Sequence, residues 1–160
     1  MYYWIKTIPL FFALCFFASC KKTNDTKEPK ITNYSLIIER GAFHYDSFKL
    51  TKDELHFYPS EIDSTSQDKY RTASKIKIDT LKSLAFFKEL EERGIWDLKK
   101  HYTEETSCTS VLRIIYRVDK KETTIECDDY KRGCPELIQA IEQKIIALEG
   151  NDLKRIYLPG

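Results

Sequence analysis

A short apolar segment near the N-terminus most strongly limits how much of this chain can form a folded domain. Residues 8–18 (IPLFFALCFFA) carry no charge, and the polar sequence Ser-Cys-Lys-Lys follows directly. A membrane-spanning helix needs roughly 20 apolar residues, so this segment is too short to span a bilayer. The basic residue before it, Lys6, and the small residues after it are typical of a secretory signal peptide. We therefore predict that residues 1–19 are a signal that is removed.

The predicted signal ends in a short motif, Phe17-Ala18-Ser19-Cys20. This motif resembles the lipobox of bacterial lipoproteins, in which small residues precede a cysteine that becomes the lipidated first residue. Phe17 departs from the family, which usually has leucine at that position. The resemblance implies that Cys20 carries lipid and anchors the protein firmly, because each buried CH₂ contributes about 0.8 kcal/mol. An ordinary signal peptide that ends near a cysteine is the alternative.

The residues after Cys20 bear on where such a lipoprotein resides. In the lipoprotein family an acidic residue directly after the cysteine often retains the protein in the inner membrane, whereas Lys21 and Lys22 follow here. The polar tether is similar to that of small uncharacterised lipoproteins of Bacteroidetes, in which an acidic cluster after the cysteine accompanies cell-surface export. Residues 21–25 lack a clear cluster of this kind. The resemblance implies an outer-membrane lipoprotein that faces the periplasm, with surface display as the alternative.

Composition limits the partners and the number of domains that the rest of the chain can have. The signal holds one of the 26 basic side chains, so 25 basic and 25 acidic side chains remain after its removal. This neutral balance argues against nucleic acid as the main partner. Residues 20–30 are polar and are expected to form the lipidated cysteine and a flexible tether. Residues 31–160 are then long enough for a single domain with its own core.

Four segments in the first half of this domain have the composition of β-strands. They are residues 34–39, 45–50, 54–58 and 70–78. The second and third alternate in polarity on either side of Thr51-Lys52-Asp53, which predicts a β-hairpin.

Two helices are predicted from their apolar periodicity and their ends. The first begins after Asp79, a suitable N-cap, and stops before Gly94, a suitable residue for the left-handed conformation that ends helices. The second begins at Cys134-Pro135 and stops at Gly150. Its apolar stripe consists of Leu137, Ile138, Ile141, Ile145 and Leu148.

A second hairpin is predicted between the helices, from residues 111–118 and 122–128. If Lys120 and Lys121 form its turn, opposed positions sum to 241, so that Tyr116 faces Ile125. The resulting order is ββββ-α-ββ-α. Runs of strands followed by helices favour the α+β class, with a mainly antiparallel sheet and helices packed on one face.

Three cysteines remain in the domain, Cys108, Cys127 and Cys134. An oxidising compartment favours one disulfide among them. In the predicted register Cys108 lies opposite position 133, so a Cys108–Cys134 bond is the first choice, contributing about 3 kcal/mol by loop-closure entropy. A Cys127–Cys134 bond is the runner-up. A reactive thiol at Cys134, at the start of a helix, is the functional alternative, although no Cys-x-x-Cys motif supports it.

A candidate recognition rim is predicted at one end of the second hairpin. His101 and Tyr102 precede this hairpin and Tyr130 and Arg132 follow it, so the four residues are expected to meet there. Ordinary loops joined by the disulfide are the alternative. The three histidines, His44, His56 and His101, lack metal-ligand spacing, and no glycine-rich phosphate loop is present, so neither a metal site nor a cofactor is predicted.

These observations favour a lipid-anchored cell-envelope protein whose domain is a non-catalytic binding or structural module. Its predicted partners are the membrane, through lipid on Cys20, and an envelope protein or ligand. A thiol-dependent envelope enzyme that uses Cys134 or Cys127 is one alternative. An inhibitor or immunity-type lipoprotein is the other.

Overall fold

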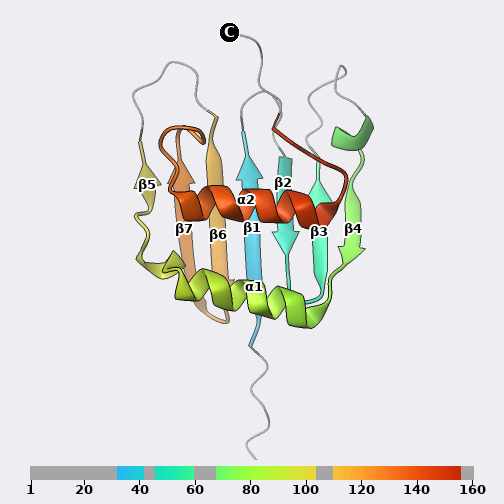
Figure 1. The fold of residues 1–160 in the computed structure, drawn as a ribbon, viewed down its shortest axis with the longest axis horizontal. Helices are drawn as coiled ribbons and strands as arrows, with labels where there is room; N and C mark the ends of the chain where they lie inside the picture. Colours follow the sequence, from blue (N-terminus) through green and yellow to red (C-terminus); the bar gives the residue numbers. More distant parts are fainter. Residues whose placement is uncertain (1–31, 42–45, 60–67, 104–109, 156–160) are drawn as a thin grey trace, which may run out of the picture. The chain divides into compact units, whose positions relative to one another are not determined.

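The computed structural model of this protein describes residues 32–41, 46–59, 68–103 and 110–155 (Figure 1). The predicted signal, lipidated Cys20, the tether, His44 and Cys108 lie outside these ranges. The strands are β1 (Tyr34–Arg40), β2 (Asp46–Leu50), β3 (Glu54–Tyr58), β4 (Ser74–Lys77), β5 (His101–Tyr102), β6 (Leu112–Val118) and β7 (Lys121–Cys127). The helices are α1 (Thr80–Glu92) and α2 (Glu136–Glu149), with 3₁₀ turns at η1 (Asp68–Tyr70) and η2 (Ile95–Asp97).

The strands form one seven-stranded sheet in the order β4-β3-β2-β1-β6-β7-β5. All neighbouring strands are antiparallel except β5 and β7, which are parallel. The predicted α+β class and mainly antiparallel sheet are therefore confirmed. The predicted element order is incomplete because it omits β5. A two-residue strand shows no periodicity of its own and is defined only by its pairing with β7.

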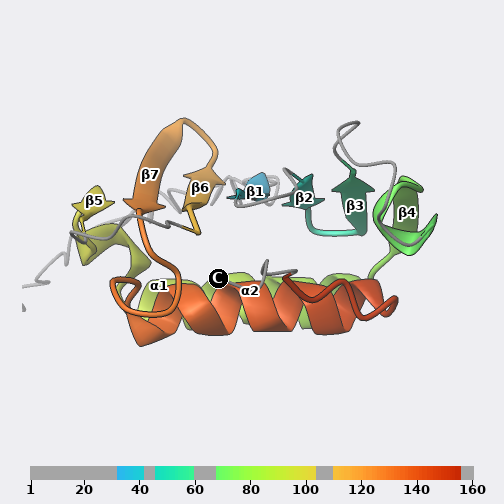
Figure 2. The same cartoon turned by 90° about the horizontal axis from the view of Figure 1, so that it is seen from above.

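Period-2 alternation divides the sheet into a buried face and an open face. In β1, for example, Leu36 and Ile38 are fully buried, whereas Ile37 between them is partly exposed. Figure 2 shows α1 and α2 on one side of the layer of strands. The buried core includes Leu36, Ile38, Phe48, Leu50, Leu55, Phe57, Phe87, Leu90, Leu112, Ile114, Tyr116, Ile125, Ile138, Ile141, Ile145 and Leu153.

Both helices begin and end where local chemistry predicts. Asp79 Oδ1 accepts a hydrogen bond from Lys82 N at 2.9 Å and thereby caps α1. Gly94 and Gly150 follow α1 and α2 with φ angles of 80° and 90°, a conformation that glycine adopts without a Cβ penalty. Within the described parts of the chain, no helix is both long and apolar enough to cross a membrane.

The predicted β2–β3 hairpin is confirmed, but the predicted register of β6 and β7 is wrong. Leu112 pairs with Cys127, so opposed positions sum to 239 rather than 241. Asp119 and Lys120 form the turn in place of Lys120 and Lys121, and Asp119 has a φ of 52°. Aspartate tolerates this left-handed conformation better than lysine does. Because the sum changes by two, every side chain keeps its predicted face.

Candidate functional site

One end of the sheet, which we call the rim end, is where β1 finishes at Arg40 and β6 begins at Leu112. β5 and β7 also finish there, at Tyr102 and Cys127, and residues 128–135 follow from this end. The chain joins the domain at the opposite end. Asn33 N donates to Asp119 Oδ1 at 2.9 Å, and Asp119 N donates to Asn33 O at 2.8 Å. The first described residues therefore lie beside the β6–β7 turn, away from the rim end.

His101 and Tyr102 of the predicted rim lie on β5. His101 Nε2 lies 3.2 Å from Asp128 Oδ1, and His101 Nδ1 lies 3.5 Å from Glu126 Oε2. The backbone carbonyl of Tyr102 accepts from Asp128 N at 3.0 Å, and its phenol oxygen accepts from Lys99 N at 3.1 Å. These contacts join β5 to the residues that follow β7.

Tyr130 and Arg132 lie in the turn between β7 and α2. Buried Asp129 stabilises this turn, because its Oδ1 accepts from Lys131 N at 2.8 Å and from Arg132 N at 3.2 Å. The Arg132 side chain is exposed, whereas the Tyr130 ring lies 4.4 Å below the guanidinium of Arg155. The structure thus brings both rim segments to one end of the sheet but leaves Arg132 more open than Tyr130.

The disulfide at this end differs from the first-choice prediction. Cys134 bonds to Cys127, with a Cα–Cα distance of 5.5 Å, and not to Cys108. The predicted Cys108–Cys134 bond followed from the incorrect hairpin register, which placed Cys108 opposite position 133. In the structure Cys127 is the last residue of β7 on the core face, seven residues before Cys134. The bond therefore closes the short connection from β7 to α2.

A buried charge cluster of Arg40, Asp46, Glu142 and Arg155 lies beneath the rim end, and sequence reasoning missed it. Arg40 Nε donates to Asp46 Oδ1 at 2.6 Å, and Arg40 Nη1 donates to Glu142 Oε1 at 3.3 Å. Arg155 Nε donates to both Glu142 oxygens, at 2.8 and 3.0 Å. Two guanidinium groups thus face two carboxylates, which balances the buried charge.

The pKa of Arg40 shows how well this cluster is compensated. Burial alone lowers the pKa of a guanidinium, because it disfavours the charged form. The hydrogen bonds and negative charges of Asp46 and Glu142 outweigh burial, so the pKa of Arg40 is raised above its ordinary value. Arg40 Nη1 also donates to Leu153 O at 2.7 Å, which ties the residues after α2 to the end of β1.

One atom of the cluster has no acceptor among the described residues. Arg155 Nη1 donates to Val111 O at 3.2 Å, whereas Arg155 Nη2 is buried without a hydrogen-bond partner in the described part of the chain. Its guanidinium instead contacts the Tyr130 ring. An aromatic face partly compensates such a cation, so this contact accounts for the position of Tyr130.

The open face of the sheet carries cross-strand ion pairs. Arg113 Nη1 lies 3.0 Å from Glu39 Oε2, and Arg113 Nε lies 2.6 Å from Glu126 Oε1. Arg117 pairs in the same way with Glu122, its direct cross-strand partner. These opposed pairs of opposite charge each contribute modestly to sheet stability.

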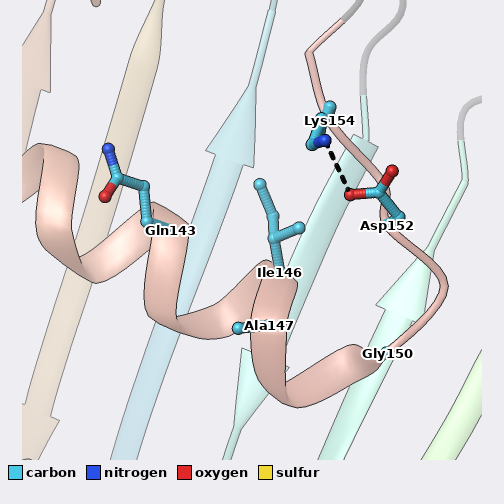
Figure 3. Close-up of a pocket in the computed structure, with 6 residues that line it drawn as sticks. All are labelled: Gln143, Ile146, Ala147, Gly150, Asp152 and Lys154. Carbon is cyan, nitrogen blue, oxygen red and sulfur yellow. Dashed lines mark ion pairs between the residues drawn. The ribbon is translucent and has the colours of Figure 1, made fainter.

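A shallow hollow of about 370 Å³ lies beside the C-terminal part of α2 (Figure 3). It is lined by Gln143, Ile146, Ala147, Gly150, Asp152 and Lys154. Lys154 Nζ lies 3.3 Å from Asp152 Oδ1, so the two titratable groups of the lining pair with each other. The lining offers apolar surface and this one ion pair, and it contains no serine, threonine, cysteine or histidine. Elsewhere in residues 32–41, 46–59, 68–103 and 110–155, no group of three or more potential ligands is arranged to hold a metal.

Comparison with known proteins adds no relative from which a function could be transferred. No protein-family model matches the chain, and no curated protein or solved structure is detectably similar to it.

Proposed function

We propose that this chain is a lipid-anchored protein of the outer membrane that faces the periplasm. In this proposal lipid on Cys20 holds the protein, and the domain is a non-catalytic module that binds an envelope partner through the rim of His101, Tyr102, Tyr130 and Arg132. The two helices lie on one side of the sheet, as Figure 2 shows.

The placement of the rim relative to the start of the domain carries the proposal. The chain joins the domain beside Asp119, and β1 runs seven residues from there to the rim end. At about 3.3 Å per residue, this separates the rim from the tethered end by about 20 Å. The rim therefore lies at the end of the sheet opposite Asn33, the end through which the domain is attached in this proposal.

The chemistry near the rim favours binding over catalysis. His101 is paired with carboxylates, and Arg40 and Glu142 compensate each other in the buried cluster. The alternative, a thiol-dependent enzyme, would use Cys127 or Cys134, but the sulfur atoms of these two residues are bonded to each other. A thiol nucleophile would first require reduction of this bond.

Lipid attachment is tested by metabolic labelling with radioactive palmitate. The Cys20→Ser variant should lose the label and leave the membrane fraction, because the thiol that receives the lipid is absent. The Cys15→Ser variant is the matched control, since this cysteine lies within the signal, and it should keep the label. A labelled Cys20→Ser protein would disprove the anchor.

Binding through the rim is tested by photo-crosslinking in intact cells. A photoreactive residue at position 132 should give one discrete adduct, whereas the same residue at position 120, at the opposite end of the sheet, should not. His101→Ala should weaken the adduct at position 132. Equal adducts at the two positions would disprove the rim as the binding surface, and an adduct with a secreted toxin or protease would favour the inhibitor alternative.

A further inference from the structure

The edge strand β4 presents an open backbone edge. It is the first strand in the sheet order, and within the described residues no strand pairs with its outer side. Ile78 N donates to Asp53 O at 2.8 Å, so these two positions form a hydrogen-bonded pair of the antiparallel ladder. Hydrogen-bonded pairs alternate along a ladder with pairs that are not hydrogen-bonded. Lys77 and Lys75 are one and three positions before Ile78, so they belong to pairs that are not hydrogen-bonded. Their N–H and C=O groups therefore point away from β3.

The same two residues place positive charge on the open face of the sheet. Both side chains are exposed. Lys75 Nζ lies 2.9 Å from Glu54 Oε1, whereas no ion pair joins Lys77 to any described residue. Lys49 lies on this face two strands away and is also exposed. The outward side chains of β2, β3 and β4 therefore carry three lysines against one glutamate, which favours an acidic partner.

The opposite side of the edge strand is apolar. Ile76 lies between the two lysines and points the other way, and Ile78 follows with the same alternation. Both side chains are partly buried and pack against the core. A strand added beside β4 would place alternate side chains next to the lysines and next to the isoleucines.

We propose that β4 is a docking strand for an extended acidic segment of a partner protein. The segment adds to the sheet through main-chain hydrogen bonds with Lys75 and Lys77, and it alternates acidic with apolar side chains. Two copies of β4 would bring like charges together, so the lysines oppose edge-to-edge association of this chain with itself. The same charges attract an acidic strand. This site is separate from the rim and does not depend on lipid attachment.

A labelled peptide tests the proposal with the full-length protein in detergent. The probe is a peptide of about ten residues that alternates glutamate and valine, and its binding is followed by fluorescence anisotropy. We expect saturable binding that weakens at high salt, because the contact is partly electrostatic. A peptide with lysine in place of glutamate should not bind. A glutamate peptide N-methylated on alternate backbone amides should bind at least about tenfold more weakly, because it loses main-chain donors.

Charge-reversal variants locate the site. Lys75→Glu with Lys77→Glu should weaken binding of the glutamate peptide about tenfold and should create binding of the lysine peptide. The matched control, Lys99→Glu with Lys120→Glu, changes the charge equally on exposed residues away from β4 and should shift affinity less than about twofold.

Absence of saturable binding would overturn the proposal. So would equal binding of the N-methylated peptide, or an equal loss in the control. Because the peptide comparisons use the unaltered protein, they decide the question even if a variant fails to fold.

Discussion

At the scale of single residues, Glu142 is the side chain on which the buried charge cluster depends most. Its carboxylate accepts from both Arg40 and Arg155 and is 1 % exposed. Glu142→Gln keeps the shape of the side chain but leaves an uncompensated positive charge beneath the rim. We expect the free energy of unfolding to fall by about 3–5 kcal/mol, as in other buried ion pairs that lose one partner. Urea denaturation followed by circular dichroism measures this change.

The control for this prediction is Glu136→Gln, in the first turn of the same helix, where the side chain is exposed. A change within about 0.5 kcal/mol is expected there. If Glu142→Gln were no more damaging than Glu136→Gln, the cluster would contribute no net stability.

Glu126 provides a pH-dependent prediction on the open face. The hydrogen bond from Arg113, and to a smaller extent its charge and that of His101, hold the pKa of this carboxyl below its ordinary value of 4.5, although slight burial acts in the opposite direction. A carboxyl whose pKa is lowered on folding stabilises the fold above its unfolded-state pKa and loses that contribution as the pH falls through the folded-state value. The stabilisation is therefore present at neutral pH and lost in acid.

NMR titration of the Glu126 side-chain carbon measures this pKa directly. Arg113→Gln should raise it towards 4.5, because the donor of the shortest hydrogen bond is lost. Arg117→Gln should leave it unchanged, since Arg117 pairs with Glu122 instead. A Glu126 titration that Arg113→Gln does not move would contradict the assigned cause.

At the scale of elements, the Cys127–Cys134 bond fixes the end of β7 to the start of α2. The two cysteines are seven residues apart, and closure of so short a loop contributes about 2.5 kcal/mol by the chain-entropy model. The Cys127→Ala/Cys134→Ala double variant should lose about that amount in urea denaturation, plus the packing of two buried sulfur atoms. Cys108→Ala should retain the disulfide.

Peptide mapping without reductant decides between the two pairings. A cross-linked peptide that contains Cys127 and Cys134 is expected, together with alkylation of Cys108. A Cys108–Cys134 peptide would instead restore the original prediction and contradict the observed bond.

The elements that sequence predicts best are those defined by local chemistry. Asp79, Gly94 and Gly150 act within one helical turn, so their positions alone indicate where α1 and α2 begin and end. The β6–β7 register was less accessible because it depends on which residue adopts positive φ, and Asp119 does so one position before the predicted turn. An error of one residue in the turn then changed the predicted disulfide.

The candidate site was predictable only in part, because some of its residues are brought together by contacts between distant parts of the chain. The predicted rim follows from chain order, because its segments flank one hairpin. Arg40 and Glu142 are 102 residues apart, and no local rule pairs them. The available signal was weaker: Arg40 continues the inward alternation of Leu36 and Ile38, and Glu142 adjoins Ile141 on the apolar stripe of α2. A charged residue at a core position indicates a buried partner but does not identify it.

At the scale of the whole molecule, the residues after α2 connect the helical layer to the sheet. Leu153 is fully buried, its carbonyl accepts from Arg40, and Arg155 completes the charge cluster. Ser74 Oγ donates to Glu149 Oε1 at 2.8 Å, so the end of α2 also contacts β4. The segment after α2, which has no helix or strand of its own, thus contributes to both the hydrophobic core and the charge cluster.

Truncation tests whether this segment is part of the cooperative fold. A chain that stops after Asn151 lacks Leu153 and Arg155 and should lose at least about 3 kcal/mol of unfolding free energy, because a buried leucine side chain alone contributes about 2–5 kcal/mol. The matched control stops after Arg155 and keeps every contact described for the segment, so it should unfold close to the full-length protein. Urea denaturation of the three chains, monitored by both tryptophan fluorescence and circular dichroism, should give one transition for each. If the chain that stops after Asn151 matched the control, the core would be complete at the end of α2 and the contacts of Leu153 and Arg155 would be dispensable for folding.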